Sequence, residues 1–325
     1  MDRPTIKPAT TGLIALAVLC ACALAALYMY LKRSSDRAAV RQEDNFRYDP
    51  SDTRRVDPKL IGFRQVGQIK TGLSRPAALA VTSKGRVFVG GDRQVRALTL
   101  EGGVAAKIDL SDDPTCLDVR EDGFMAVGFI DHIEVYDAAG KRQHVWPPGP
   151  KGCYITCVRL SEKDVWVADA GRRLVMRCDL EGRILLELGK GTLNVPSPHL
   201  DVDLAPDGTV WLANPGNQRL EAYTPDGQPV RQFGKPGTAP GYFPGCCNPS
   251  DFVILPDGDI ATSEKGAARV TLYRPDGTFQ CVVADETMLG DIEGAMDLAV
   301  DGRGRVYVLD TLGKTVRIFA RKENR

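Results

Sequence analysis

The stretch Pro206-Asp207-Gly208-Thr209-Val210-Trp211-Leu212 decides the fold, because altered copies of it recur along the chain. An Asp-Gly or Lys-Gly pair between apolar residues is typical of a β-hairpin, since the turn needs a residue at positive φ. The copies follow one another at a spacing of about 44 residues, the size of one propeller blade. Their turns fall at Gly85, Gly123, Lys163, Gly208, Gly258 and Gly304.

A second hairpin follows the first in several copies and has similar turn chemistry. Examples are Leu180-Glu181-Gly182, Pro225-Asp226-Gly227 and Pro275-Asp276-Gly277. Two hairpins make four strands, so each copy predicts one blade, and six copies predict an all-β, six-bladed β-propeller. The sixth copy is one strand short, and we expect the strand near 62–69 to complete it and close the ring. A β-sandwich would give no reason for six matched copies.

Composition narrows the classes of function. The 325 residues carry 42 basic and 42 acidic side chains, so the net charge is zero. A nucleic-acid-binding protein would carry a basic excess, and we therefore expect no nucleic-acid partner. A hydrophobic content of 43% together with 33 glycines argues against wholesale disorder. Three histidines leave no room for a zinc site that uses three or four of them near one motif.

The N-terminal part of the chain predicts a membrane element. The segment Gly12 to Leu31 has no charged residue and is long enough to cross a bilayer as a helix. We expect residues 1–33 to be an anchor, with a cleaved signal peptide as the alternative. Residues 34–58 predict a polar tether, and 59–325 the propeller. The prediction is a single-pass membrane protein with an extracytoplasmic propeller, although the flanking positive charges slightly favour the opposite orientation.

One mouth of the propeller channel gathers the unusual residues. Seven residues before the turns lie Ala78, Cys116, Thr156, Asp201, Asp251 and Asp297, which places acids from three neighbouring blades at one level. The starts of the innermost strands and the loops joining second to third strands reach this same face. The predicted ligand or partner mouth consists of Cys153, Tyr154, His199, Cys246, Cys247, Asn248, Glu264, Lys265, Asp169 and Asn214.

The segment Val167-Ala168-Asp169-Ala170-Gly171-Arg172-Arg173-Leu174-Val175 resembles the core of an NHL repeat, whose pattern is a strand, V-A-D, a polar loop, Arg and a new strand. Trp211-Leu212-Ala213-Asn214 and Val308-Leu309-Asp310 are degenerate copies. The resemblance covers about residues 60–320 and implies an NHL-type six-bladed propeller, a class that includes scaffolds and ligand-binding modules. Similar propellers serve as lyases, lactonases and hydrolases. The resemblance also implies a structural role for the aspartate of V-A-D.

Two sets of residues suggest cofactors. The acids Asp201, Asp251, Asp297 and Glu293 have the oxygen chemistry that Ca²⁺ prefers, and similar lactonase-type propellers hold such an ion at the mouth. The alternative is that each aspartate bonds the backbone of the neighbouring blade. The cysteines Cys153, Cys246 and Cys247 suggest a disulfide, a redox pair or a thiol-bound metal. The remaining propeller cysteines are expected to be small buried apolar residues.

These observations lead to three predicted functions. The first is a membrane-anchored NHL-type propeller that binds a protein or small-molecule ligand at one channel mouth, because six strand starts and six loops converge there. The second is a metal-dependent hydrolase, lactonase or lyase that uses the acid level. The third is a thiol, redox or soft-metal protein. A serine triad or a phosphate-binding loop is not visible in the sequence.

Overall fold

The computed structural model describes residues 23–29, 32, 55–290, 294 and 296–323. The chain divides into two units, Met1–Pro50 and Ser51–Arg325. In the first unit, residues 23–29 are helical and the apolar side chains of Leu24 and Leu27 are exposed. No helix within the described residues is both long enough and apolar enough to span a bilayer. The predicted anchor falls mainly on residues outside the described ranges.

The second unit is built almost entirely from antiparallel strands. In the part of the chain that the structure describes, the strands form six four-stranded sheets. The strands are β1 (Phe63–Lys70), β2 (Pro76–Val81), β3 (Val87–Gly91), β4 (Gln94–Leu98), β5 (Val104–Asp109), β6 (Cys116–Val119), β7 (Met125–Gly128), β8 (Ile133–Tyr136), β9 (Arg142–Val145), β10 (Ile155–Leu160), β11 (Asp164–Asp169), β12 (Leu174–Asp179), β13 (Ile184–Leu188), β14 (Val202–Leu204), β15 (Val210–Asn214), β16 (Arg219–Tyr223), β17 (Pro229–Phe233), β18 (Asp251–Ile254), β19 (Ile260–Glu264), β20 (Arg269–Tyr273), β21 (Phe279–Ala284), β22 (Asp297–Val300), β23 (Val306–Asp310) and β24 (Thr315–Arg321). Short helices η1 (Pro58–Leu60), η2 (Pro215–Asn217) and α3 (Glu286–Leu289) lie outside the sheets.

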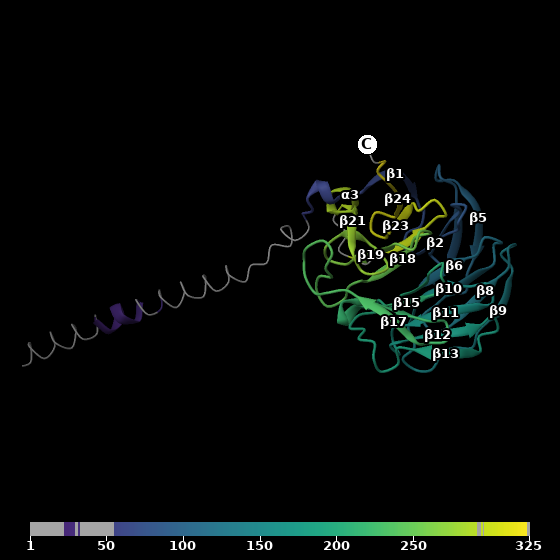
Figure 1. Cartoon of the computed structure of the whole chain (residues 1–325), viewed down its shortest axis with the longest axis horizontal. Helices are drawn as coiled ribbons and strands as arrows, with labels where there is room; N and C mark the ends of the chain where they lie inside the picture. Colours follow the sequence, from purple (N-terminus) through teal and green to yellow (C-terminus); the bar gives the residue numbers. More distant parts are fainter. Residues whose placement is uncertain (1–22, 30–31, 33–54, 291–293, 295, 324–325) are drawn as a thin grey trace, which may run out of the picture. The chain divides into compact units, whose positions relative to one another are not determined.

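The six sheets are the predicted blades. Figure 1 shows β2, β6 and β10 toward the middle of the ring and β5, β9 and β13 at its outer edge. The inner strands of successive blades contact one another around the ring. The first hairpin of each blade turns where the sequence predicted it. At Gly208, for example, φ is 86°, a value that a side chain would disfavour. The six-bladed propeller is therefore confirmed.

The N-terminal strand closes the ring. Strand β1 pairs antiparallel with β24, from Phe63 opposite Arg321 to Lys70 opposite Thr315. The last sheet has the order β1-β24-β23-β22, so its outermost strand comes from the start of the propeller sequence. This confirms the predicted role of the strand near 62–69. Closure in this way joins the two ends of the ring by backbone hydrogen bonds and leaves no blade incomplete.

The hydrophobic core lies between neighbouring blades. Apolar side chains of one sheet alternate inward and outward, and each buried face packs against the next sheet. Val253 and Leu272 of the fifth blade, for instance, share a cluster with Leu298 and Val308 of the sixth. Because every blade contributes side chains to two such layers, the ring is stabilised as a whole and holds the starts of its inner strands in fixed positions.

Candidate functional site: a pocket at one end of the channel

A pocket of about 390 Å³ opens at one end of the central channel. Every blade contributes to its lining, and one residue from each blade illustrates this. These residues are Ala77, Cys116, Tyr154, Asp201, Asp251 and Asp297. The loops that join second to third strands add Ile130 and Thr311. The pocket is therefore the place where the six blades bring different side chains together, as the sequence predicted for one mouth.

The three aspartates of the predicted acid level link adjacent blades. Each carboxylate accepts a hydrogen bond from a backbone N–H on the inner strand of the next blade. The bonds run from Phe252 N to Asp201 Oδ2 (2.8 Å), from Leu298 N to Asp251 Oδ1 (3.1 Å) and from Leu79 N to Asp297 Oδ2 (2.6 Å). The interblade contact that the sequence analysis gave as the alternative to a metal site is thus present at all three positions.

A second level of charged residues lies two residues further along the inner strands. Asp118 accepts a hydrogen bond from Leu160 N at 2.8 Å, and Asp203 accepts one from Ile254 N at 2.7 Å. Both aspartates line a smaller cavity of about 200 Å³. These two contacts also join neighbouring blades, so hydrogen bonds from a backbone N–H to the aspartate of the preceding blade occur at both levels of the channel.

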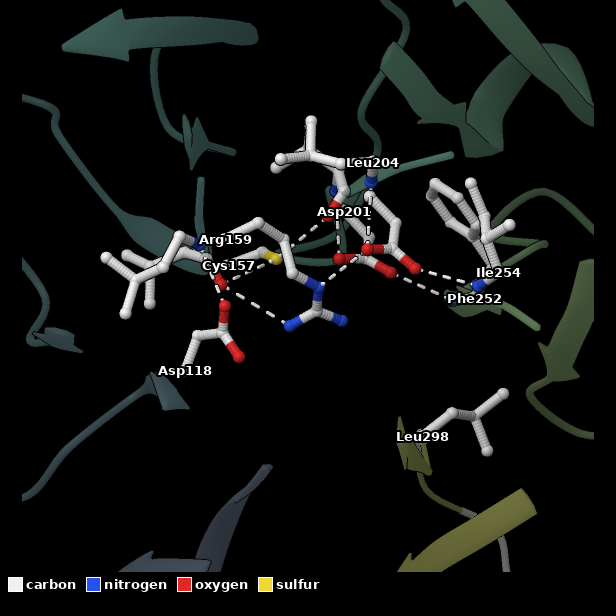
Figure 2. Close-up of polar contacts among 12 residues, drawn as sticks. Asp118, Cys157, Arg159, Asp201, Leu204, Phe252, Ile254 and Leu298 are labelled. Atoms are coloured by element: carbon white, nitrogen blue, oxygen red, sulfur yellow. Dashed lines mark hydrogen bonds and ion pairs between the residues drawn. The ribbon is translucent and has the colours of Figure 1, made fainter. Parts of the chain in front are cut away.

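Arg159 of β10 lies at the centre of this arrangement. Figure 2 shows its guanidinium group between Asp118 on one side and Asp201 on the other. Its Nε donates to Asp203 Oδ1 at 3.2 Å, and its Nη1 donates to the carbonyl oxygen of Val158 at 3.3 Å. The side chain is 13% exposed and lines both cavities. Arg159 therefore separates the pocket from the smaller cavity.

The charges around Arg159 do not balance. Five aspartates lie close enough for its positive charge to lower their pKa values: Asp118, Asp201, Asp203, Asp251 and Asp297. Burial is nevertheless the largest influence on each and raises the pKa in every case. It raises the pKa of Asp297 to about 7, and at Asp251 the charges of Asp201 and Asp297 add to the effect of burial. The part of the pocket lined by Asp201, Asp251 and Asp297, called here the pocket floor, therefore favours a positively charged group of a ligand.

Two thiols share the pocket floor with these carboxylates. Burial raises the pKa of Cys116 to about 12 and that of Cys157 well above its usual value, so both are neutral thiols at physiological pH. The Cys157 thiol donates to the carbonyl oxygen of Val202, 3.4 Å away. These cysteines are packed rather than reactive, which agrees with the role expected for the propeller cysteines other than Cys153, Cys246 and Cys247.

The rim of the pocket carries His199 and Tyr154. Burial, and then the charge of Lys265, lower the pKa of His199 to about 4, so its imidazole is neutral at physiological pH. The His199 Nε2 atom lies 3.4 Å from Lys265 Nζ. Tyr154 is 37% exposed. The structure thus places Tyr154 and His199, two of the predicted mouth residues, on the pocket, with Lys265 against His199.

Asp169 and Asn214, also predicted at the mouth, end the second strands of their blades and are fully buried. Asp169 Oδ1 accepts hydrogen bonds from Tyr154 N at 3.0 Å and Arg172 N at 2.9 Å. Asn214 Nδ2 donates to Glu221 Oε1 at 2.7 Å. Neither lines the pocket. Both side chains hold loops beside the mouth, the role that the resemblance implied for the V-A-D aspartate.

Glu264 and Asn248 hold the long approach before the fifth blade. Glu264 forms a buried ion pair with Arg269, whose Nη1 donates to Thr238 O at 3.0 Å. Asn248 is 2% exposed; its Oδ1 accepts from Lys265 N at 2.7 Å, and its Nδ2 donates to Lys265 O at 2.9 Å and Pro244 O at 2.7 Å. These two predicted mouth residues position backbone and do not line the pocket.

The three cysteines singled out by the sequence are free thiols. Cys153 is half-buried; burial, and then a hydrogen bond to Asp169, raise its pKa to about 12. Cys246 and Cys247 lie together in the loop before β18, with their sulfur atoms 3.3 Å apart. They do not line the pocket.

The calcium hypothesis stays a prediction. Asp201, Asp251 and Asp297 share the pocket, but Glu293 lies outside the described residues. Within residues that the structure describes, no group of three or more His, Cys, Asp or Glu side chains is arranged to hold a metal ion. The described carboxylates face backbone amides and Arg159 instead.

Sequence reasoning missed Arg159, Asp118 and Asp203, and for Arg159 the reason is a shortened turn in the third blade. Ser161 N bonds Asp164 O, whereas Ala205 N of the next blade bonds Thr209 O, so the third blade's first turn has one residue fewer. Counting back from that turn placed Thr156 at the acid level, where the structure has Cys157. Counting back from the strand ends would have aligned Arg159 with Asp118 and Asp203.

No protein-family model matches the chain, and no curated protein matches its sequence. Solved structures do match. One is described as a streptogramin B lyase structure, with 13% identity and a TM-score of 0.57, covering 80% of this chain and 98% of that chain. Another is the WD40 β-propeller domain of Doa1, with 14% identity and a TM-score of 0.55, covering 76% and 79%. At these identities the likeness shows the propeller fold alone.

Proposed function

We propose that the protein is a binding module that takes a small molecule bearing a cationic group, such as a protonated amine, in the channel pocket. The observation that carries this proposal is the composition of the pocket: all six blades line it, and five carboxylates near its floor share one guanidinium group. A cationic ligand would offset the cost of the buried negative charges and would lower the pKa values that burial has raised.

The ligand would meet two kinds of surface. The Asp251 Oδ1 and Asp297 Oδ2 oxygens accept backbone hydrogen bonds, which leaves the other carboxylate oxygen of each as the acceptor for the ligand's charge. Ile130, Met296 and the ring of Tyr154 supply apolar surface above them. A pocket with apolar walls and a few convergent polar groups is the usual form of a small-molecule site.

Thermal-shift and calorimetric titration of the full chain with agmatine, cadaverine and choline tests the proposal, with caproate as an anionic comparison. We expect at least one amine to bind and caproate not to bind. Asp297→Asn should weaken that binding by at least about tenfold, because a charge-assisted hydrogen bond contributes about 1.5–3 kcal/mol. Asp207→Asn, on an exposed turn, is the matched control. Equal binding by Asp297→Asn and the unchanged chain would refute the proposal.

An enzyme acting in the same pocket is the second candidate function. Asp297, with its pKa raised to about 7, and the neutral imidazole of His199 both line the cavity, and perturbed pKa values of this kind are common at catalytic sites. A lyase is also among the solved structures with this fold. The predicted metal-dependent form is tested by elemental analysis: bound calcium that is lost in Asp297→Asn would favour it over the binding module.

The NHL type of the propeller is part of this proposal. Its support is the geometry of Asp169, which accepts hydrogen bonds from two loop amides as the resemblance implies. Asp169→Ala should destabilise the propeller, because it leaves two partly buried N–H groups without an acceptor, at a cost of up to about 1–3 kcal/mol each. Chemical denaturation measures this loss. An unchanged midpoint would remove the structural role of Asp169 and with it the support for the NHL type.

We also propose that the segment Gly12 to Leu31 tethers the propeller to a membrane, with the propeller on the extracytoplasmic side. The support is the uncharged, apolar character of this segment. The full chain should stay in the membrane fraction after alkaline extraction, and a form lacking residues 1–33 should not. Protease added to cells whose outer barrier has been opened should degrade the propeller. Degradation only after the inner membrane is opened would overturn the orientation.

A further inference from the structure

The loop before β18 presents two neighbouring thiols. Cys246 is exposed, Cys247 is half-buried, and their Sγ atoms are 3.3 Å apart. Neither sulfur belongs to the channel pocket. A site formed by this pair would be independent of the proposed function.

The backbone that carries the two thiols is held on both sides. On one side, Gln218 Nε2 donates to the carbonyl oxygen of Gly245. On the other, the Asn248 side chain makes three hydrogen bonds, to Pro244 O, Lys265 O and Lys265 N. A ligand that engages both sulfurs therefore does not have to order a flexible loop, and such preorganisation favours two-point binding.

The electrostatics of the pair differ from those of the other propeller cysteines. Burial raises the pKa values of Cys116 and Cys178 to about 12. At Cys246, the hydrogen bond with Cys247 and then the charge of that sulfur raise the pKa, while the ammonium group of Lys265 lowers it. One thiol of the pair therefore donates a hydrogen bond to the other sulfur, and an electrophile that binds both sulfurs replaces both thiol protons.

The distance between the sulfurs limits what can bridge them. A disulfide bond needs about 2.05 Å, so the pair is held as two thiols. With central atom–sulfur bonds of about 2.3 Å, two sulfurs 3.3 Å apart subtend an angle of about 90°. A linear centre would need a separation of about 4.6 Å and a tetrahedral one about 3.8 Å with the same bonds. The pair therefore suits a pyramidal centre with bond angles close to a right angle.

We propose that Cys246 and Cys247 together form a binding site for trivalent arsenicals. Trivalent arsenic is thiophilic and pyramidal, because its lone pair occupies the fourth position. With an organoarsenic oxide, two As–S bonds form while the As=O bond and two S–H bonds break. The two thiol protons and the oxygen leave as one water molecule, and no electrons are transferred to or from the protein.

The test uses phenylarsine oxide and the full chain. Cys20 and Cys22 are replaced by serine in every version, so that these two thiols cannot bind the probe. After reduction and removal of the reductant, intact mass spectrometry should show one phenylarsenic group per chain. The adduct should survive excess glutathione and should be removed by ethanedithiol. Chelation by two thiols should make retention about 100-fold stronger than attachment through one.

Matched variants locate the site. Cys246→Ser and Cys247→Ser should each lose the glutathione-resistant adduct, whereas Cys153→Ser should keep it. Asp297→Asn, which removes a pocket carboxylate, should also keep it, so that failure here and failure of the proposed function are distinguishable. A resistant adduct in either single variant at the pair, or an adduct on the unchanged pair that glutathione removes, would overturn the proposal.

Discussion

The two ends of the channel are built from the same six inner strands, yet they differ in chemistry. The pocket end brings Asp251, Asp297 and His199 into a cavity of about 390 Å³. The other end is a cavity of about 200 Å³; most of its lining residues are aliphatic, but Leu79 and Leu298 bury their side chains between blades. Arg159 lines both. The comparison shows that the side chains of the pocket come from the starts of the inner strands and from loops, and differ from blade to blade. The residues further along the inner strands mainly join neighbouring blades.

The largest effect is expected from the residue that both ends share. Arg159→Met removes the cation that, within the described residues, lowers the pKa values of five carboxylates, and breaking a buried charge pair from one side costs about 3–5 kcal/mol. Urea denaturation at pH 7.5 should show this loss. Arg183→Met, at a 79% exposed position, should leave the free energy of unfolding nearly unchanged. If both variants unfold at the same urea concentration, Arg159 does not balance the buried carboxylates.

A smaller loss is expected at the aliphatic end. Leu298 is fully buried and lines the smaller cavity. Leu298→Ala should cost about 2–3 kcal/mol, because the side chain packs in the apolar cluster between the fifth and sixth blades and its truncation leaves a cavity there. Amine binding in the pocket should persist, since the Leu298 amide that bonds Asp251 remains. If Leu298→Ala lowers both amine binding and the free energy of unfolding, ligand binding at the pocket end depends on packing at the other end.

The pocket end should make stability depend on pH. The folded-state pKa of Asp297 is raised to about 7 from 3.8, so the folded protein holds an extra proton between these values. Stability from this group is therefore greatest below pH 3.8 and falls as pH rises toward 7, by at most about 1.4 kcal/mol per pH unit. Asp297→Asn should flatten the stability profile between pH 5 and 7, measured by thermal denaturation. If the unchanged chain and Asp297→Asn lose stability in parallel between pH 5 and 7, the raised pKa of Asp297 is not the cause.

The smallest stability effect is expected at the rim. Tyr154 is 37% exposed, and no hydrogen bond of its hydroxyl is found among the described residues. Tyr154→Phe should change the free energy of unfolding by less than about 0.5 kcal/mol. Chemical denaturation measures this change, and amine titration shows whether the hydroxyl contacts the ligand. A large loss of stability would mean that the rim is structural like the opposite end.

Sequence reasoning predicted much of the fold because its signals are local. Glycine and Asp-Gly turns marked each hairpin, and alternating apolar residues marked the strands. The site was predicted less completely. Asp201, Asp251 and Asp297 were placed at one level correctly, but Arg159 was missed because a turn shorter by one residue shifted the third blade out of alignment. Glu264 and Asn248 were placed at the mouth, where the structure uses them to hold backbone.

The sequence alone determined the number of blades, the strand order and the closing strand, because hairpin turns depend on residues adjacent in the chain. Only the tertiary structure decided which polar residues share a cavity. Asp201 and Phe252, for example, are 51 residues apart in sequence and joined by one hydrogen bond. Such contacts depend on how adjacent blades pack, and a single sequence does not record that packing. The charge imbalance around Arg159 therefore became visible only once the ring was closed.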